Sequence, residues 1–573
     1  MNGGAAPTFF PYLLSAIFSI GTATIAEPSN SRLRLIPCIL LALFAAQSLW
    51  FINTQSLTYD EPAHIIAGSE AWRMGKFERW NDHPPLGRLW LTLPIARTPL
   101  DVDVQFTERD FLVTRLQPGP EWIAWRTRPM NTLLGLALGV ALWFATRRIF
   151  SEGAANIALG LFAFTPSLIA HFSVATTDGI GALFIFLVAV QLVRWRHSRH
   201  TGQTALMGLA LGGLLLSKFY APPLVLLALV LMLFVSRDNH RLLSSRVNWK
   251  PAVGALAIAL MVLWAGYFFH VSRLDVADGH VRASFPNRPM REWPSATKLH
   301  LSAIIPAGEF IEGLREVARN NHHGRPAWLL GKVHPQGGVW EYYPAAIILK
   351  WPTMLVVLLL LNTALGLRGK SCAPGDLLLM MLFPLVFFLF ALNAKYNIGE
   401  RHILPLYPFG LLLAGGIWRS HPSQKKGKMG QPPTSSLGKV LIVLALCLNA
   451  ADALRYAPDY LSYFNVLVRP QNSWRLLTDS NLDWGQGLIA LRTYEQQHPD
   501  EPLHLAYFGS VDPALYGIQA ATLQPHEQTE GTVVIGATLL SGQTLADSDA
   551  FHWLWPYQAR QVIDHSLWVY EPK

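Results

Sequence analysis

Two adjacent acids, Asp60 and Glu61, stand just after a long apolar run in "SLTYDEPAHIIAGSEAWRMGKFERWNDHPPLGR", residues 56–88. A carboxylate held near a reacting hydroxyl can serve as a general base. Pro62 keeps the residue before it extended and suits the first turn of a helix, so a helix is expected from Pro62 onwards. One acid suffices to cap that helix. On this geometry Asp60 is the acid left free for chemistry.

Cationic and imidazole side chains accompany the two acids. His64 lies in the expected helix, and "HPPL" forms a rigid extended turn that presents His83 and Arg88 at the membrane surface. An ordinary solvated surface turn is the alternative interpretation. Fixed cations at such a place would stabilise a developing negative charge.

Further ionisable residues gather at the ends of apolar runs. They are His171, Asp178, Lys218, His270, Lys350, Lys395, Glu400, Arg401, His402, Asp452 and Arg455. Long side chains at helix ends that reach for water are the simpler alternative for each one. A transporter would instead place charges near the membrane midplane, on broken helices in repeated halves. Charges gathered at one interface favour a site where a lipid headgroup meets a water-soluble partner.

The elements that must position these residues are membrane helices. The chain has 573 residues, 51% of them hydrophobic and 14% charged, which is typical of a polytopic membrane protein. The net charge of +9 is not accompanied by basic tracts interleaved with aromatic residues, so nothing predicts nucleic-acid binding. Cys38, Cys372 and Cys447 are scattered and have neither metal-ligand nor disulfide spacing.

Apolar runs long enough to cross a bilayer predict about eleven transmembrane helices. They lie near 33–52, 129–148, 154–172, 178–195, 205–220, 221–236, 251–270, 344–366, 376–393, 402–418 and 437–454. Residues 1–32 form an N-terminal extension in which the apolar run 8–26 is either an extra helix or unstructured. Every second connection is basic, as expected for cytoplasmic loops. The transmembrane module, 33–454, therefore has external loops at 53–128 and 271–343.

The C-terminal segment, 455–573, is predicted to be a small external α/β domain. "PLHLAYFG", "GTVVIGAT" and "SLWVYEP" have strand patterns, and "GQGLIALRTYEQQ" has a helical one. Asp483 and Trp484 in "LDWGQ" could contact a sugar, although packing or turn roles are favoured. The predicted fold class is an all-α polytopic membrane protein with this small α/β extramembrane domain.

Ordered motifs resemble those of a known family of enzymes. "DEPAHIIAGSEAWRMGKF", "HPPL", "ATTDG", "SKFYAPP", "WEYYPAAIILKWP" and "NIGERHILPLYPF" resemble the membrane glycosyltransferases of the protein O-mannosyltransferase type. This superfamily has the GT-C architecture and includes the aminoarabinose transferase of lipid A. The tail sequences "DSNLDWGQGLIALRTY" and "YFGSVDPALYGI" resemble a bacterial branch of it. Members transfer a sugar from a polyprenyl or dolichyl phosphate to an acceptor at the outer face.

The resemblance implies roles for individual residues. Asp60 takes the place of the catalytic acid, with Glu61 beside it, and Asp178 takes a second acidic position that in some relatives helps to bind metal or acceptor. Lys218 and Arg401 resemble cations near the carrier phosphate. "HPPL" stands where the aminoarabinose transferases have an acid-Lys-Pro motif, so His83 or Arg88 would replace that lysine. His64, Lys350 and His402 complete the candidate substrate-binding residues.

These roles predict transfer of a hexose or pentose from a polyprenyl-phosphate carrier to a protein, lipid or glycan acceptor. One base and a phosphate leaving group favour direct displacement with inversion, although a retaining route through a carboxylate nucleophile stays open. Two nearby carboxylates repel unless a cation or a proton intervenes, so a divalent metal ion at Asp60 and Asp178 is one expectation. A transporter or flippase of a lipid-linked precursor and a non-catalytic envelope scaffold are the alternative functions. The expected location is the cell membrane, with the site on the periplasmic or extracellular side.

Overall fold

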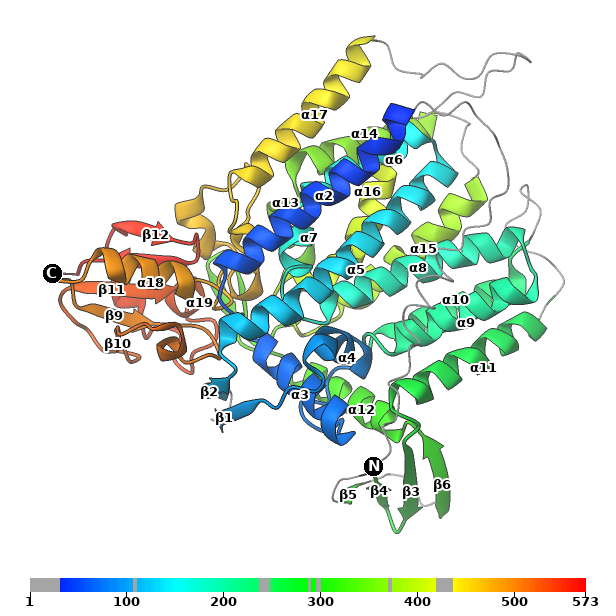
Figure 1. Ribbon diagram of the computed structural model, residues 1–573, viewed down its shortest axis with the longest axis horizontal. Coiled ribbons are helices and arrows are strands. Elements are labelled where there is room, and N and C mark those ends of the chain that lie inside the picture. Colours follow the sequence, from blue (N-terminus) through cyan, green and yellow to red (C-terminus); the bar gives the residue numbers. More distant parts are fainter. Residues whose placement is uncertain are drawn as a thin grey trace.

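Long apolar helices form the body of the protein (Figure 1). The computed structural model describes residues 31–106, 111–236, 247, 249–286, 290–294, 300–368, 374–418 and 436–572. Within these residues, six helices are long and apolar enough to cross a membrane. They are α2 (Ser31–Thr54), α5 (Pro120–Ile149), α8 (Asp178–His197), α11 (Trp249–Gly266), α15 (Pro374–Leu392) and α17 (Ser436–Leu454). The chain is thus a helical, multi-pass membrane protein.

The other predicted spans are broken or short. Helices α13 (Tyr342–Lys350) and α14 (Thr353–Arg368) qualify as one span only together, and they are bent by 107° at a break that contains Pro352. Pro352 cannot donate a backbone hydrogen bond, which explains a break at this point. The remaining predicted intervals contain helices well below the roughly 20 residues that a bilayer core requires. These are α6 (Glu152–Ala163), α7 (Pro166–His171), α9 (Thr201–Leu215), α10 (Ala221–Phe234) and α16 (Tyr407–Gly415).

The count of eleven full-length helices is therefore too high by length alone, because six helices qualify, or seven with the bent pair. Proline accounts for several of the interruptions: Pro166 is the first residue of α7, and Pro222 and Pro223 lie in the first turn of α10. The apolar run 8–26 and the basic loops 237–246 and 419–435 lie outside the described residues.

The first connecting loop folds into α3 (Glu61–Met74), α4 (Pro85–Thr92) and the antiparallel hairpin β1 (Asp101–Phe106) and β2 (Phe111–Gln117). The second loop contains a sheet of order β5-β4-β3-β6, all antiparallel. Its strands are β3 (Val271–Ala277), β4 (His280–Ser284), β5 (Arg291–Pro294) and β6 (Leu301–Pro306), followed by α12 (Gly308–His323), β7 (Ala327–Leu329) and β8 (Lys332–His334). The predicted all-α class of the part before the tail did not include these strands.

The tail has the predicted α/β character. Helix α18 (Leu488–Gln497) accompanies a mixed sheet of order β10-β9-β11-β13-β12. Its strands are β9 (Leu503–Ala506), β10 (Ala521–Thr522), β11 (Thr532–Gly536), β12 (Gln561–Ile563) and β13 (Leu567–Tyr570), with the short helix α19 (Ala537–Leu540) after β11. Strands β9, β11 and β13 and helix α18 fall inside the four stretches from which they were predicted.

Both loops and the tail meet at the end of the bundle away from the start of α2 and α17 (Figure 1). The loops contact each other where Asn81 Nδ2 donates to Glu312 Oε2 at 3.0 Å. The tail reaches the first helix after loop one through Arg492 and Glu121, whose atoms are 2.8 Å apart. Because these segments share one end, residues far apart in sequence can form one site there.

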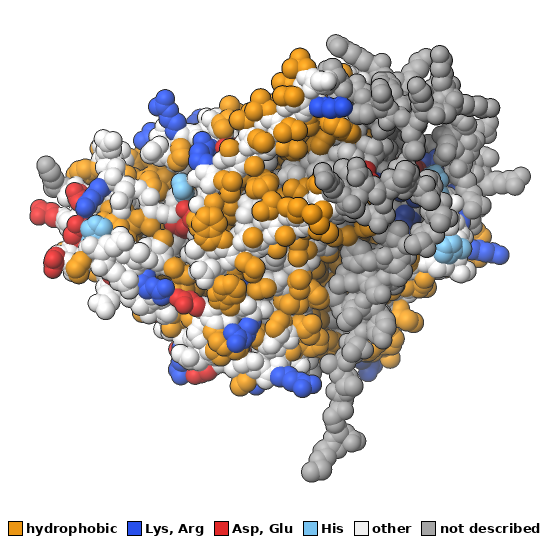
Figure 2. Space-filling model, turned by 45° about the horizontal axis from the view of Figure 1, so that its top comes forward, with side chains coloured by type: hydrophobic (Ala, Val, Ile, Leu, Met, Phe, Trp, Pro, Cys, Tyr) orange, Lys and Arg blue, Asp and Glu red, His pale blue; other side chains and the backbone are white. Residues whose placement is uncertain are grey.

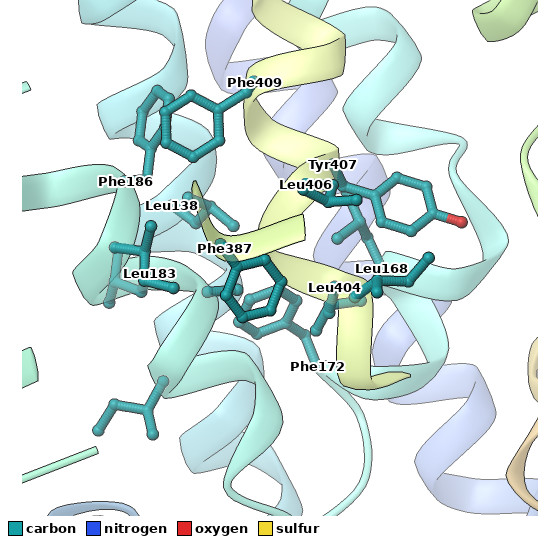
Figure 3. Close-up of a cluster of buried hydrophobic side chains, with 14 of the residues drawn as sticks. Leu138, Leu168, Phe172, Leu183, Phe186, Phe387, Leu404, Leu406, Tyr407 and Phe409 are labelled. Atoms are coloured by element: carbon teal, nitrogen blue, oxygen red, sulfur yellow. The ribbon is translucent and has the colours of Figure 1, made fainter. Parts of the chain in front are cut away.

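Apolar side chains hold the bundle together and also cover much of its outside. Figure 2 shows hydrophobic side chains spread over the bundle surface, with charged ones mostly toward its ends. Such a surface suits hydrocarbon rather than water. In the interior, α8 and α16 meet where the Phe186 and Phe409 ring centres are 5.2 Å apart. Figure 3 shows the same cluster reaching Leu404 and Leu406 of the 3₁₀ segment η2 (Glu400–Leu406), which is thereby held in place.

Candidate functional site

The guanidinium of Arg401 joins two acids from separate elements. Its Nη1 lies 2.7 Å from Asp60 Oδ2 and 3.5 Å from Asp178 Oδ2. The other oxygen of Asp178 lies 2.7 Å from Lys218 Nζ. Four of the predicted site residues, from the first loop, α8, the end of α9 and η2, thus form one ion-pair network. The two contacts at 2.7 Å have the length of charge-assisted hydrogen bonds, which are among the stronger ones in proteins.

Local backbone structure explains why Asp60 faces Arg401. Asp60 is the N-cap residue of α3, yet its side chain makes no capping hydrogen bond. Instead Glu61 Oε2 accepts the Thr58 backbone N–H at 2.7 Å. The Asp60 side chain keeps 28% of its surface exposed, whereas that of Asp178 keeps 4%. Of the two acids on Arg401, Asp60 is therefore the one a water-soluble molecule can reach.

Glu61 has a structural partner that the sequence did not indicate. Its two oxygens accept hydrogen bonds from Arg128 Nε and Nη2 at 2.8 and 2.7 Å, and both side chains are fully buried. Arg128 also donates to the backbone carbonyls of Gln55 and Ser56, each at 2.6 Å, and the Ala175 N–H donates to Glu61 at 2.6 Å. Every polar atom of this pair is occupied. The structure therefore offers no reason to give Glu61 a chemical role beside Asp60.

The Glu61→Gln variant is expected to lose stability rather than a reactive group. It leaves Arg128 buried without its counter-charge, and breaking a buried pair in this way typically costs roughly 3–5 kcal/mol. Thermal unfolding of the purified protein in detergent should show a clear drop in Tm, with Asp60→Asn close to wild type as the matched comparison. A Glu61→Gln protein that is as stable as wild type but inactive would show that Glu61 takes part in the reaction.

Two imidazoles lie beside Lys218. His83 Nδ1 is 3.4 Å from Lys218 Nζ and 3.1 Å from Thr177 Oγ1, and the His64 and His83 ring centres are 4.8 Å apart. Burial, reinforced by nearby cations, lowers the pKa of both histidines well below the usual value. Neutral His83 can accept a hydrogen bond from Lys218. His83 is thus the residue of "HPPL" that reaches the ion-pair network.

Arg88 lies further from the ion-pair network than His83 does. Its Nε donates to His64 Nδ1 at 3.2 Å, and its Nη2 lies 3.4 Å from Asp82 Oδ1. Burial raises the pKa of Asp82, and the Arg88 charge opposes that rise. Arg88 therefore orients His64 and is itself paired, so of the two candidates it is the less available for a phosphate.

Lys350 and His402 do not join the network. Lys350 is buried and donates to the Leu461 carbonyl at 3.0 Å, with Glu400 Oε1 at 4.0 Å. It connects α13 to the tail and to η2. His402 Nε2 is buried without a hydrogen-bond partner among the described residues.

The tail supplies residues that sequence reasoning missed. Ser480 Oγ accepts from Arg401 Nε at 3.0 Å, and the Arg401 guanidinium carbon lies 4.1 Å from the Trp484 ring centre. Trp484 is a packing residue, as favoured, but it packs on the central cation of the site. Asp483 accepts backbone N–H groups of Gly485 and Thr538, each at 3.2 Å, which is the favoured turn role. The motif "DSNLDWGQ" indicated that this part of the tail is functionally relevant. Nothing in the motif indicated which cation it would contact.

The donor atoms at Asp60 and Asp178 do not fit a metal ion. Among the described residues, no group of three or more histidine, cysteine or acidic side chains could hold one. The acidic oxygens instead face Arg401 and Lys218, which already supply the positive charge that two close carboxylates require.

Comparison with known proteins adds structures of similar length. The fold is similar to ArnT from Cupriavidus metallidurans bound to undecaprenyl phosphate, with 13% identity, TM-score 0.48, and coverage of 95% of this chain and 98% of that one. It is also similar to the S. cerevisiae protein O-mannosyltransferase Pmt1-Pmt2 complex bound to the sugar donor, with 12% identity, TM-score 0.45, and coverage of 78% and 91%. No curated protein matches the chain significantly by sequence.

A protein-family model matches one part of the chain. Residues 122–264 match the family described as dolichyl-phosphate-mannose-protein mannosyltransferase. The matched segment runs from α5 to α11 and includes Asp178 and Lys218, whereas Asp60, Arg401 and the tail lie outside it. The resemblance inferred from the motifs is confirmed, because residues 122–264 match the model of a family of membrane glycosyltransferases.

Proposed function

We propose that this enzyme transfers a hexose or pentose from a polyprenyl-phosphate carrier to a hydroxyl of a protein, lipid or glycan acceptor. The observation that carries the proposal is the convergence of Asp60, Asp178, Lys218 and Arg401 at one end of the bundle, with contacts of 2.7–3.5 Å. This set combines a reachable carboxylate with two fixed cations. A phosphate leaving group and an acceptor hydroxyl require these two kinds of group.

In the proposed step the acceptor oxygen attacks the anomeric carbon while the bond from that carbon to the phosphate oxygen breaks. The acceptor proton passes to Asp60, and the bonding electrons leave with the carrier phosphate. Lys218 and Arg401 stabilise that negative charge as it develops. Asp60 is suited to the base because its side chain is partly exposed and has one carboxylate oxygen outside the ion pair with Arg401.

Inversion is the proposed stereochemical outcome. A retaining mechanism needs a carboxylate nucleophile placed against the sugar. Both oxygens of Asp178 contact cations, Lys218 at 2.7 Å and Arg401 at 3.5 Å, which makes this carboxylate a poor nucleophile. A single displacement with Asp60 as base is then the simplest route.

The proposed architecture is GT-C, with the short helices and the bent pair completing about eleven passes. The proposed side is the outer face, periplasmic in a Gram-negative cell, because Arg147, Arg148 and the basic end of α8 lie at the opposite end of the bundle from both loops and the tail (Figure 1).

Single cysteines placed in a background without the three native ones should report this orientation. Ala318→Cys in the second loop and Glu530→Cys in the tail replace exposed residues and should react with a membrane-impermeant reagent in intact cells. Arg148→Cys, exposed at the other end, should react only after the inner face is opened. The reverse pattern would place the site on the cytoplasmic side.

The function itself is tested with purified protein in proteoliposomes supplied with a panel of labelled lipid-linked sugars. The proposal expects a new glycosidic bond and free polyprenyl phosphate. Movement of label across the membrane without a new bond would identify a transporter or flippase. A scaffold would form no product and would support envelope assembly even with Asp60 changed to Asn. A parallel series with a chelator tests separately whether a divalent cation is required.

A further inference from the structure

A turn of the tail lies directly against the segment that carries Arg401. The turn is η5 (Asp479–Asn481), and its central residue, Ser480, is 1% exposed. The Ser480 hydroxyl accepts a hydrogen bond from Arg401 Nε at 3.0 Å and donates one to the Ile398 carbonyl at 2.8 Å. One hydroxyl group of the tail thus binds both the guanidinium and the backbone just before η2.

Asn481, the next residue, fixes the backbone of η2 itself. Its Oδ1 accepts the Glu400 N–H at 2.9 Å. Its Nδ2 donates to Tyr342 Oη of α13 at 2.8 Å and to the Thr478 carbonyl at 2.9 Å. Asn481 is fully buried, so the loss of one of these bonds would leave a buried polar group unsatisfied. The tail therefore sets the position of Glu400, the residue that precedes Arg401.

A buried lysine and a buried acid join the same two segments. Lys350, the last residue of α13, is 1% exposed, and its ammonium group donates to the Asn481 carbonyl. Glu400 Oε1 lies 4.0 Å from that ammonium group, and the Glu400 oxygens also accept hydrogen bonds from the Ser167 and Tyr407 hydroxyls. The proposed mechanism gives this pair no chemical role. Its contacts hold η5 and η2 together.

Gly399 gives the turn room to approach η2. A Cβ atom placed on Gly399 would lie 2.0 Å from Ser480 Oγ and 3.2 Å from Ser480 Cβ. The first distance is far too short for two atoms that are not bonded, so only glycine fits while the Ser480 hydroxyl binds Arg401. The backbone of Gly399 is extended, with φ of 173°, so space rather than conformation requires a glycine here.

The orientation of the guanidinium matters because both acids contact the same nitrogen. Arg401 Nη1 lies 2.7 Å from Asp60 Oδ2 and 3.5 Å from Asp178 Oδ2, so a rotation at the end of the side chain would break a contact. An arginine side chain has much rotational freedom, and the Ser480 contact at Nε restrains it. Donors that are fixed before the reaction stabilise developing charge without having to reorganise.

We propose that the tail turn η5 positions Arg401 for sugar transfer, with Ser480 and Asn481 as positioning residues and Gly399 as the residue that lets the turn approach. The inference rests on the proposed function, in which Arg401 stabilises the charge on the leaving phosphate. It gives the tail a part in the reaction, although none of its three residues need touch the substrate. The transfer site is then complete only when the tail is docked on η2.

The test compares kcat/KM for Ser480→Ala in two backgrounds, using the full chain in proteoliposomes and a labelled lipid-linked sugar. In the wild-type background the variant should be roughly tenfold slower, the scale for losing one hydrogen bond to a charged group. In the Arg401→Lys background a methylene group stands where Arg401 has Nε. The same change should there have an effect of about twofold or less, because a residue that acts through Nε is coupled to it.

A second variant approaches the same contact from the other side. Gly399→Ala should slow transfer about as much as Ser480→Ala, because its methyl group displaces the Ser480 hydroxyl. Gly119→Ala is its control, since a Cβ there meets nothing within 4 Å. Ser473→Ala is the control for Ser480→Ala. Ser473 is a 2% exposed serine of the tail whose hydroxyl donates to the Pro470 carbonyl at 2.7 Å, and its loss should keep the wild-type rate.

Two results would overturn the inference while the proposed function stands. Ser480→Ala could slow transfer by the same factor in both backgrounds, which indicates a general structural role. Alternatively, folded Ser480→Ala and Gly399→Ala proteins could both transfer sugar at the wild-type rate. If wild-type protein forms no product from any lipid-linked sugar, the proposed function fails and the inference fails with it.

Discussion

Purified Asp60→Asn protein is expected to fold normally and to transfer sugar roughly 100-fold more slowly than wild type, or slower still, the usual scale for losing a general base. The substitution preserves the size of the side chain, and the Asp60 side chain makes no capping hydrogen bond that the change could remove. It removes the negative charge that would accept the acceptor proton and that pairs with Arg401 at 2.7 Å. Initial rates with a labelled lipid-linked sugar, together with the Tm, measure both parts of the expectation.

Asp82→Asn is the matched control for this variant. Asp82 comes from the same loop and pairs with Arg88 at 3.4 Å, so its loss should change the rate far less. Near-normal transfer by a folded Asp60→Asn protein would mean that the base lies elsewhere.

Arg401→Lys is expected to have the second large effect, a drop in kcat/KM of roughly 100-fold or more, comparable with losing one preorganised donor at a charged transition state. Lysine keeps the charge but lacks the planar fork with several donors. It cannot contact Asp60, Asp178 and Ser480 together, as Arg401 does, nor stack on Trp484 in the same way. The measurement is kcat and KM for the donor lipid under saturating acceptor.

Two further variants show whether this effect belongs to the site. Arg492→Lys changes a partly exposed arginine, paired with Glu121 at the same end of the bundle, and should leave transfer unchanged. Lys218→Ala should raise the donor KM because it removes a cation from the proposed phosphate position. Wild-type kinetics in both Arg401→Lys and Lys218→Ala would leave these residues as structural ion pairs.

The central ion-pair network was predictable in outline from the sequence. Asp60, Asp178, Lys218 and Arg401 each stand at the end of an apolar run, and alternation of basic loops assigns those ends to one side. Helix ends on one side of a membrane lie in the same thin interfacial layer, so the polar residues at these ends are confined to that layer. Their proximity follows from that restriction, although which cation meets which acid does not.

Long-range pairing could not be predicted. Arg128 lies near the start of α5, where an arginine ordinarily reaches for water, and nothing local indicates that it is fully buried against Glu61. Ser480 lies in the tail, far from Arg401 in sequence, and reaches it only because the tail packs on η2. The sequence predicts Lys350 as a cation at the outer face, but its ammonium group donates a hydrogen bond to the Leu461 carbonyl.

Helix lengths were overestimated for a physical reason. Hydropathy reports apolar composition, not helical continuity, so it predicts one span over 154–172 although Pro166 separates α6 from α7. Pro352 has the same effect between α13 and α14. Strands β3 to β6 in the second loop were missed because much of that sheet is exposed and lacks a clean apolar alternation.

A single-turnover comparison tests the central claim most directly. Wild-type and Asp60→Asn proteins are each saturated with the same labelled polyprenyl-phosphate sugar, and bound lipid, released polyprenyl phosphate and glycosidic product are followed together. Both proteins should bind the lipid equally, since Lys218 and Arg401 remain, and only wild type should convert it rapidly to product and free carrier. Equal conversion by the two proteins, or conversion by neither with any lipid-linked sugar, would contradict the account.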